Sequence, residues 1–297
     1  MQLVAVDIGN SATKLAPFDH RQGNLKVGSS RRWFGEAIDI ESFDQFCQTF
    51  DSQTATWFFS SVHPEKQASL IQWINEHRPA DATQQLNDIP ITNDTAEPDR
   101  VGRDRLLAAL GAWDLSKDLG FDKPALVVVD AGTAVTVDWV DEQGTFRGGN
   151  IYLGADSQFS QLEHQTAALP NLSFASRQQR LTELEQQRRA PIHSTSIGRS
   201  TLDAILVGTY QSQIGGLTHL LTTLCRQVKT EHGVVIFATG GGWQELDQAC
   251  QAVNQISLRK LIRANTGCRQ LVVNANLVLH GVAKASMLSE SDNPRDP

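Results

Sequence analysis

The stretch "VAVDIGNSAT", residues 4–13, is an apolar run that ends in an aspartate and turns on a glycine. It recurs 123 residues downstream as "VVVDAGTAVT", residues 127–136. Aligned on Asp7 and Asp130, the two copies share Val4/Val127, Val6/Val129, Asp7/Asp130, Gly9/Gly132 and Thr13/Thr136. An aspartate at the tip of a buried strand is costly unless a cation or a hydrogen-bond donor meets it. The repeat therefore raises the question of what each aspartate faces.

Each copy opens one half of the chain, which predicts two similar domains, residues 1–120 and 121–297, divided near Asp118 to Pro124. The polar tail from Ser289 onward is expected to be frayed. Alternation of strand-like and helix-like segments indicates an α/β protein. The strand meander that follows each Asp-x-Gly turn predicts mixed sheets and disfavours a pure dinucleotide-binding sheet.

Hydrophobic periodicity and breaker residues predict the main elements. Strands are expected at Leu3–Val6, residues 54–62, 125–129 and 233–239. The helices predicted by the same signals are Pro64–His77, residues 103–120, Gln158–Leu169, Thr201–Lys229 and Trp243–Ala252.

Composition excludes several classes of protein. The 297 residues carry a net charge of -7, which disfavours non-specific binding to nucleic acid or to an anionic membrane. The four cysteines form no C-x-x-C pair, so disulfides and zinc are not expected. No basic leader precedes the first strand, and no apolar run approaches the roughly 20 residues of a membrane span. We expect a cytoplasmic protein.

Paired Asp-x-Gly turns suit nucleotide phosphates, because glycine lets the backbone approach an oxyanion closely. The aspartate can hold Mg²⁺, largely through water. Lys14 and the hydroxyls of Ser11, Thr13 and Thr133 could contact phosphate oxygens, although turn and cap chemistry explains each hydroxyl taken alone. Neither G-x-x-x-x-G-K-[ST] nor G-x-G-x-x-G occurs in the sequence, so no other phosphate motif competes.

"VGRDRLLAAL", residues 101–110, places Asp104 between Arg103 and Arg105 at a predicted helix start. Compensation of the helix dipole is the simple explanation for Asp104. The two arginines oppose that explanation and could bind a small carboxylate. Asp104 could then accept the proton of a substrate hydroxyl, as phosphoryl transfer requires.

These segments, with "SSVHP", "GGNIYLG", "TAALP", "IGRST" and "ATGG" in the same order, resemble the type III pantothenate kinases. That family belongs to the superfamily of acetate and sugar kinases, Hsp70 and actin. The resemblance covers nearly the whole chain. It implies two actin-like (ribonuclease H-like) domains with the active site in the cleft between them. It also implies ATP-dependent phosphorylation of the terminal hydroxyl of pantothenate, the first step towards coenzyme A.

The resemblance also implies roles for individual residues. Asp104 becomes the general base, and Asp130 belongs to a site for a monovalent cation, K⁺ or NH₄⁺. The residues implied in binding Mg²⁺-ATP are Asp7, Ile8, Gly9, Asn10, Ser11, Ala12, Thr13, Lys14 and Thr133. The residues implied in binding pantothenate are Thr95, Gly102, Arg103, Asp104, Arg105 and Thr201. Family members are usually homodimers, so a homodimer is expected.

Two positions depart from the family pattern. Thr95 stands where the family usually has a tyrosine, and Arg103 stands where it prefers a small residue. Both positions belong to the implied acceptor pocket. The alternatives are therefore a kinase for another small hydroxy acid, a phosphohydrolase on the same fold, and a non-catalytic regulatory homologue.

Overall fold

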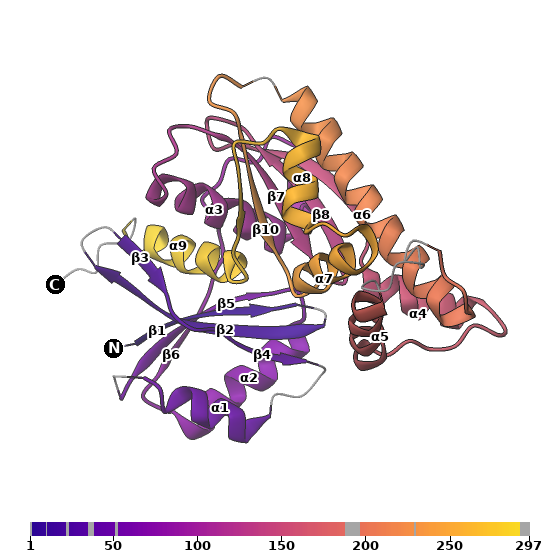
Figure 1. The fold of residues 1–297 in the computed structure, drawn as a ribbon. Helices are drawn as coiled ribbons and strands as arrows, with labels where there is room; N and C mark the ends of the chain where they lie inside the picture. The colour runs from indigo at the N-terminus through magenta and orange to yellow at the C-terminus, as the bar shows by residue number, and fades with distance from the viewer. Residues whose placement is uncertain are drawn as a thin grey trace. The chain divides into compact units, whose positions relative to one another are not determined.

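The computed structural model describes residues 2–9, 11–21, 24–34, 39–50, 53–187, 197–228 and 230–291. The chain forms two compact units (Figure 1). The first comprises Met1–Lys123, Val140–Gly148 and Asn276–Pro297, and the second comprises Pro124–Trp139 and Gly149–Ala275.

The first unit contains a six-stranded mixed sheet in the order β3-β2-β1-β5-β6, with β4 paired to β2. Strand β1 pairs antiparallel with β2 and parallel with β5. Its strands are β1 (Gln2–Ile8), β2 (Ala12–Arg21), β3 (Asn24–Val27), β4 (Arg31–Phe34), β5 (Ala55–Ser61) and β6 (Ala82–Gln85). Strand β6 is absent from the sequence-based expectation, because "ATQQ" lacks the apolar pattern of a buried strand.

Helices cover both faces of this sheet. Val4, Val6 and Ile8 of β1 pack in one apolar cluster with residues of α1 (Ile40–Cys47) and α2 (Pro64–His77). Helix α9 (Leu277–Ser291) packs against β1, β2, β3 and β5, and also against α3 (Arg103–Asp118).

The contact between α3 and α9 is very close. A Cβ atom at Gly111 would lie 2.3 Å from the carbonyl oxygen of Leu277, and one at Gly281 would lie 2.0 Å from that of Leu107. The C-terminal helix thus belongs to the first unit because glycines on both helices let the two backbones touch. Helix α9 also carries Ser289–Ser291, where the frayed tail was expected to begin; the rest of that tail lies outside the described residues.

The second sheet has the order β11-β10-β7-β8-β9, with β10 parallel to both β7 and β11. The two-residue connection between β7 and β8 makes that pair antiparallel, so this sheet is also mixed. Its strands are β7 (Ala125–Ala131), β8 (Ala134–Val140), β9 (Phe146–Leu153), β10 (Val234–Thr239) and β11 (Gln270–Val273). The prediction of an α/β protein with two mixed sheets is confirmed.

The helices of the second unit pack on Val127, Val129 and Ala131 of β7 in a large apolar cluster. They are α4 (Ala155–Gln165), α5 (Phe174–Gln187), α6 (Thr201–Gln227), α7 (Trp243–Asn254) and α8 (Leu258–Thr266). Helices α5 and α8 were not predicted. Helix α4 begins three residues before its predicted start and ends four residues before its predicted end. Gly154 takes its N-cap position.

The units are not consecutive halves of the chain. The first segment of the first unit ends at Lys123, inside the region where the boundary was expected, but residues 140–148 and 276–297 rejoin that unit later. A division into domains at residue 120 remains a prediction.

Candidate active site

The first Asp-x-Gly hairpin joins β1 to β2. Asp7 is opposite Lys14 in the antiparallel register, and Lys14 Nζ lies 3.8 Å from Asp7 Oδ2. The N–H of Gly9 donates to the carbonyl oxygen of Ala12 at 2.9 Å and closes the turn. Asp7 is only 8% exposed. A buried carboxylate with a lysine beside it can bind Mg²⁺ and phosphate together, since Mg²⁺ in phosphate sites usually takes one or two carboxylates and the phosphate oxygens.

The register of β1 and β2 also places other residues implied in nucleotide binding. Ile8 pairs with Thr13, and both are buried, whereas Ser11 is exposed. Asn10 lies outside the described residues. The parallel neighbour β5 places Ser60 opposite Asp7, and the N–H of Val62 donates to the carbonyl oxygen of Ile8 at 3.0 Å.

Asp104 lies in the first turn of α3, with Gly102 at the N-cap. Its Oδ1 accepts from the backbone N–H of Arg105 at 3.0 Å, and the side chain is exposed. A Cβ atom at Gly102 would lie 2.5 Å from Asp104 Oδ1. Glycine at position 102 therefore makes room for this carboxylate, which stays accessible to a ligand.

Arg103 contacts protein backbone. Its guanidinium donates to the carbonyl oxygen of Asn87 at 3.0 Å and to that of Leu86, and the N–H of Leu86 donates to the carbonyl oxygen of Phe59 in β5. Its Nε is buried with no hydrogen-bond partner in the described part of the chain. Arg103 thus ties the start of α3 to the segment that follows β6.

Thr95 lies in a loop held by side-chain hydrogen bonds. Its hydroxyl donates to Asn93 Oδ1 at 2.9 Å, and Asn93 Nδ2 donates to the carbonyl oxygen of Pro98 at 3.1 Å. Asn93 also bridges to Phe146, and the guanidinium of Arg105 lies 5.4 Å from the centre of the Phe146 ring. The Thr95 loop and the start of α3 thus share one support in Phe146.

The second Asp-x-Gly hairpin, between β7 and β8, contains Asp130 and Thr133. Its turn closes with the N–H of Gly132 donating to the carbonyl oxygen of Ala134 at 3.0 Å. Asp130 pairs with Thr239 at the end of β10, where the glycine turn 240–242 begins. The hairpin therefore lies directly beside that turn.

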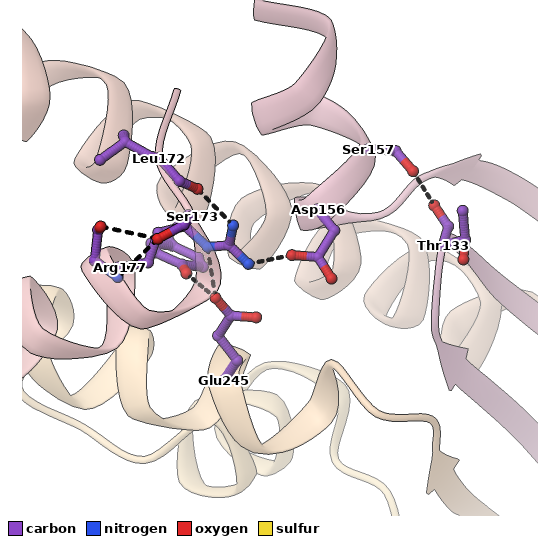
Figure 2. A network of polar contacts seen from close by, with 9 residues as sticks. Thr133, Asp156, Ser157, Leu172, Ser173, Arg177 and Glu245 are labelled. Carbon is purple, nitrogen blue, oxygen red and sulfur yellow. Dashed lines mark hydrogen bonds and ion pairs between the residues drawn. The ribbon is translucent and has the colours of Figure 1, made fainter. Parts of the chain in front are cut away.

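Two helix starts hold this second hairpin by its backbone. The carbonyl oxygen of Thr133 accepts from the N–H of Gly154 at 2.9 Å and from the hydroxyl of Ser157 at 2.8 Å (Figure 2). The carbonyl oxygen of Ala131 accepts from the N–H of Gly242 at 2.8 Å. Helix α4 begins at the first contact and helix α7 at the second.

Thr201, the first residue of α6, lines a cavity of about 700 Å³ between α4 and α6. The other residues around it are mainly apolar or carry amide groups; they include Leu153, Gln161, Leu162, Leu169 and Ile205. Thr201 is exposed, and Ser200 caps the helix by accepting from the N–H of Asp203 at 3.1 Å. A small ligand could reach the hydroxyl of Thr201 from this cavity.

Comparison with known proteins agrees with the motifs. The family model for type III pantothenate kinase matches residues 3–223. This match covers well over half of the chain and includes both hairpins, the start of α3 and the start of α6. The chain belongs to the type III pantothenate kinase family.

Relatives named type III pantothenate kinase match over different lengths. The protein from Azobacteroides pseudotrichonymphae is 28% identical over 65% of this chain and 62% of its own length. The one from Rhodopirellula baltica is 39% identical over 45% of this chain and 43% of its own length. The chain therefore spans less than two thirds of these two curated relatives. The protein from Thermus thermophilus is 25% identical over 89% of this chain and 99% of its own length.

Among solved structures, the chain is similar to a ROK family glucokinase from Streptomyces griseus in complex with glucose and AMPPNP. The TM-score is 0.46 and the identity 11%, over 96% of this chain and 98% of that one.

Beyond the family motifs, the second unit contains polar groups that the sequence did not identify. Ser157 donates to the hairpin directly, and Arg177 links Asp156, the neighbour of Ser157, to Glu245 of α7 (Figure 2). Helix α5, which carries Arg177, has a strongly polar composition that gives no sign of a buried charge. In the described part of the chain, no three His, Cys, Asp or Glu side chains gather as a metal site. No helix there is long and apolar enough to cross a membrane.

Proposed function

We propose that this chain transfers the γ-phosphoryl group of ATP to the terminal hydroxyl of pantothenate. The product is 4'-phosphopantothenate, the first intermediate on the way to coenzyme A. The observation that carries this proposal is the family match over residues 3–223, a range that includes both Asp-x-Gly hairpins, Asp104 and Thr201.

The hairpin from Asp7 to Lys14 binds the phosphates of ATP. Asp7 holds Mg²⁺, and the backbone around Gly9 approaches the phosphate oxygens. The ion pair with Lys14 supports this role, because it keeps a cation at the carboxylate before the nucleotide arrives. Mg²⁺ neutralises charge on the transferred group when it is bound. Thr133 contacts the nucleotide as well.

Asp104 accepts the proton of the pantothenate hydroxyl. The oxygen of that hydroxyl forms a bond to the γ-phosphorus while the bond between the γ-phosphorus and the bridging oxygen of ADP breaks. The exposure of the Asp104 carboxylate supports this role, because a general base must reach its substrate. The absence of a Cβ at Gly102 keeps the required space open.

Thr95, Gly102, Arg105 and Thr201 contact pantothenate. Arg105 is suited to the carboxylate of this substrate, because its guanidinium is held at the same helix start as Asp104. Arg103 contributes indirectly, because its donors bind the carbonyl oxygens of residues 86 and 87 and so fix the position of α3.

A monovalent cation, K⁺ or NH₄⁺, binds at Asp130. The family match, which covers Asp130, supports this proposal, as does the place of the Asp130 carboxylate near the end of β7, beside Thr239 of β10. Carboxylate and carbonyl oxygens are suitable ligands for such an ion.

The protein acts in the cytoplasm as a homodimer. Apolar side chains exposed on the second unit support self-association. They come from the edge strand β9 and from the segments around the starts of α5 and α6: Ile151, Leu153, Phe174, Ile197 and Leu202. Sedimentation over a range of protein concentrations would test this part of the proposal.

The proposed substrate and cation can be tested with an ATP-consumption assay. It compares pantothenate with a panel of small hydroxy acids, in potassium, ammonium or sodium buffer. Asp104→Asn is the decisive variant: the catalytic rate should fall by about 10²- to 10⁴-fold, while the nucleotide dissociation constant stays within a few-fold. If Asp104 only compensates the helix dipole, the change costs at most about 1 kcal/mol of stability. A folded variant with near-normal turnover would rule out the catalytic role.

A further inference from the structure

We propose that Arg177 is a positioning residue for the second Asp-x-Gly hairpin and so for nucleotide binding. The inference rests on the proposed function, because that function assigns Asp130 and Thr133 to the cation and the nucleotide. It adds a residue outside both hairpins, on helix α5.

The backbone of the hairpin has one partner on each side. The first turn of α4 holds the carbonyl oxygen of Thr133, and the turn before α7 holds that of Ala131. The packing is tight on both sides: a Cβ atom at Gly154 would lie 2.1 Å from the carbonyl oxygen of Gly132, and one at Gly240 would lie 2.3 Å from that of Ala131. A small shift of either helix start would therefore move the hairpin.

Arg177 joins the same two helix starts (Figure 2). Its Nε donates to Glu245 Oε1 in the first turn of α7 at 2.9 Å, and a terminal nitrogen donates to Asp156 in the first turn of α4. Another terminal nitrogen donates to the carbonyl oxygen of Leu172 at 2.8 Å. One guanidinium thus sets the spacing between the two helices that hold the hairpin.

The surroundings keep this guanidinium in one place. Arg177 is 3% exposed, and its guanidinium carbon lies 4.6 Å from the centre of the Phe159 ring and 5.6 Å from that of Phe174. Glu245 is 5% exposed and also accepts from the hydroxyl of Tyr210. A planar guanidinium can make these bonds in several directions at once, and a lysine ammonium cannot reproduce the same fork.

Asp156 is the best position for a test, because its side chain is 70% exposed. Asp156→Ala removes the link to α4 with little effect on the core. Asp156→Asn keeps one acceptor oxygen. Arg177→Lys removes the fork but leaves a buried charge, so it can lower stability as well.

Arg180→Lys is the matched control. Arg180 lies on the same helix and makes an equally close pair with Asp203 of α6, through Nε at 2.6 Å and a terminal nitrogen at 3.0 Å. Its ion-pair partners in the described part of the chain are Asp203 of α6 and Glu183 of α5 itself.

The measurements are the dissociation constant of Mg²⁺-AMPPNP by calorimetry, that of pantothenate, and the melting temperature. Asp156→Ala should weaken AMPPNP binding by about tenfold, as loss of an outer-shell contact typically does. Asp156→Asn should retain most of the affinity. Pantothenate binding to the Asp156→Ala protein should stay within about twofold, and AMPPNP binding to the Arg180→Lys protein should also stay within about twofold.

The outcomes separate this inference from the proposed function. If the wild-type protein binds no AMPPNP, both the proposed function and the inference are wrong. If the wild type binds and a folded Asp156→Ala protein binds equally well, only the inference is wrong. Equal weakening of AMPPNP and pantothenate, or the same loss in Arg180→Lys, would show a general structural role and would also overturn it.

Discussion

The two Asp-x-Gly hairpins share five of ten residues, yet the protein holds them in different ways. In the first, Lys14 lies beside Asp7, and a hydrogen bond from Gly9 to Ala12 closes the turn. In the second, the closing bond reaches Ala134, one residue earlier than the aligned sequence predicts. The shorter turn leaves the carbonyl oxygen of Thr133 to α4.

The difference shows that one local sequence pattern can be held in place by two kinds of contact. The first hairpin contains a positively charged side chain, Lys14, beside Asp7 and is suited to Mg²⁺ and phosphate. The second has uncharged residues, Thr136 and Val137, in the strand that follows its turn. Its shape depends on groups distant in sequence, Gly154, Ser157 and Gly242.

The largest effect should come from removing the positive charge of Lys14 in the first hairpin. Lys14→Met keeps the length of the side chain and removes the ammonium. We expect kcat/KM for ATP to fall by about 10²- to 10³-fold, since one lost electrostatic contact to the transferring group typically costs that much. Steady-state kinetics checks this, with the melting temperature as the control for folding. A loss of less than threefold would mean that the two hairpins do not differ in this way.

A smaller effect distinguishes the glycines of the two sites. Gly240 has a φ of +94°, and a Cβ there would lie 2.3 Å from the carbonyl oxygen of Ala131, whereas a Cβ at Gly9 would lie an ordinary 3.4 Å from that of Ala12. Gly240→Ala should lower the free energy of unfolding by roughly 1–3 kcal/mol, through backbone strain and overlap.

Gly9→Ala should leave the free energy of unfolding within about 0.5 kcal/mol of the wild-type value, as substitutions that disturb no packing usually do. Its effect should fall on ATP binding, because the added methyl group would keep phosphate from the backbone. Denaturant unfolding of both variants is the measurement. Equal destabilisation of the two would contradict the view that only the second hairpin depends on close packing from outside.

The sequence predicts the first hairpin better than the second for a physical reason. Asp7, Gly9 and Lys14 are close in sequence, and strand pairing alone brings the carboxylate and the ammonium together. The repeat also located Asp130 correctly at the end of a buried strand. What holds that second hairpin in place could not be predicted, because it is made by tertiary contacts.

Helix α5 is the clearest example. Its residues "FASRQQRLTELEQQ" look solvent-exposed, and yet Arg177 is buried among partners from α4 and α7, up to 68 residues away. No periodicity indicates which arginine of such a helix is buried. Similarly, the sequence around Asp104 did not show that the guanidinium of Arg103 donates to two backbone carbonyl groups; its role in substrate binding stays a prediction.

The smallest effect concerns the ion pair between Arg180 of α5 and Asp203 of α6. This pair joins two helices of the second unit. The hydrogen bonds from Arg180 hold the pKa of the Asp203 carboxyl below its ordinary value of 3.8, against the opposite effect of burial. A lowered pKa in the folded state adds stability above pH 3.8, and this contribution is lost as the pH falls through the folded-state pKa.

Asp203→Asn should therefore lower stability at pH 7 by about 1 kcal/mol, or roughly 2–4 °C in melting temperature. The difference from the wild type should be constant between pH 7 and pH 5 and should shrink as the pH falls below about 3.8, because the wild-type carboxyl then becomes protonated too. Melting curves of both proteins across this range give the answer, and AMPPNP affinity at pH 7 should stay the same. A stability difference that persists unchanged at pH 3 would show that shape rather than charge makes the contact. A loss of nucleotide affinity would show that α6 as well as α4 and α7 controls the second hairpin.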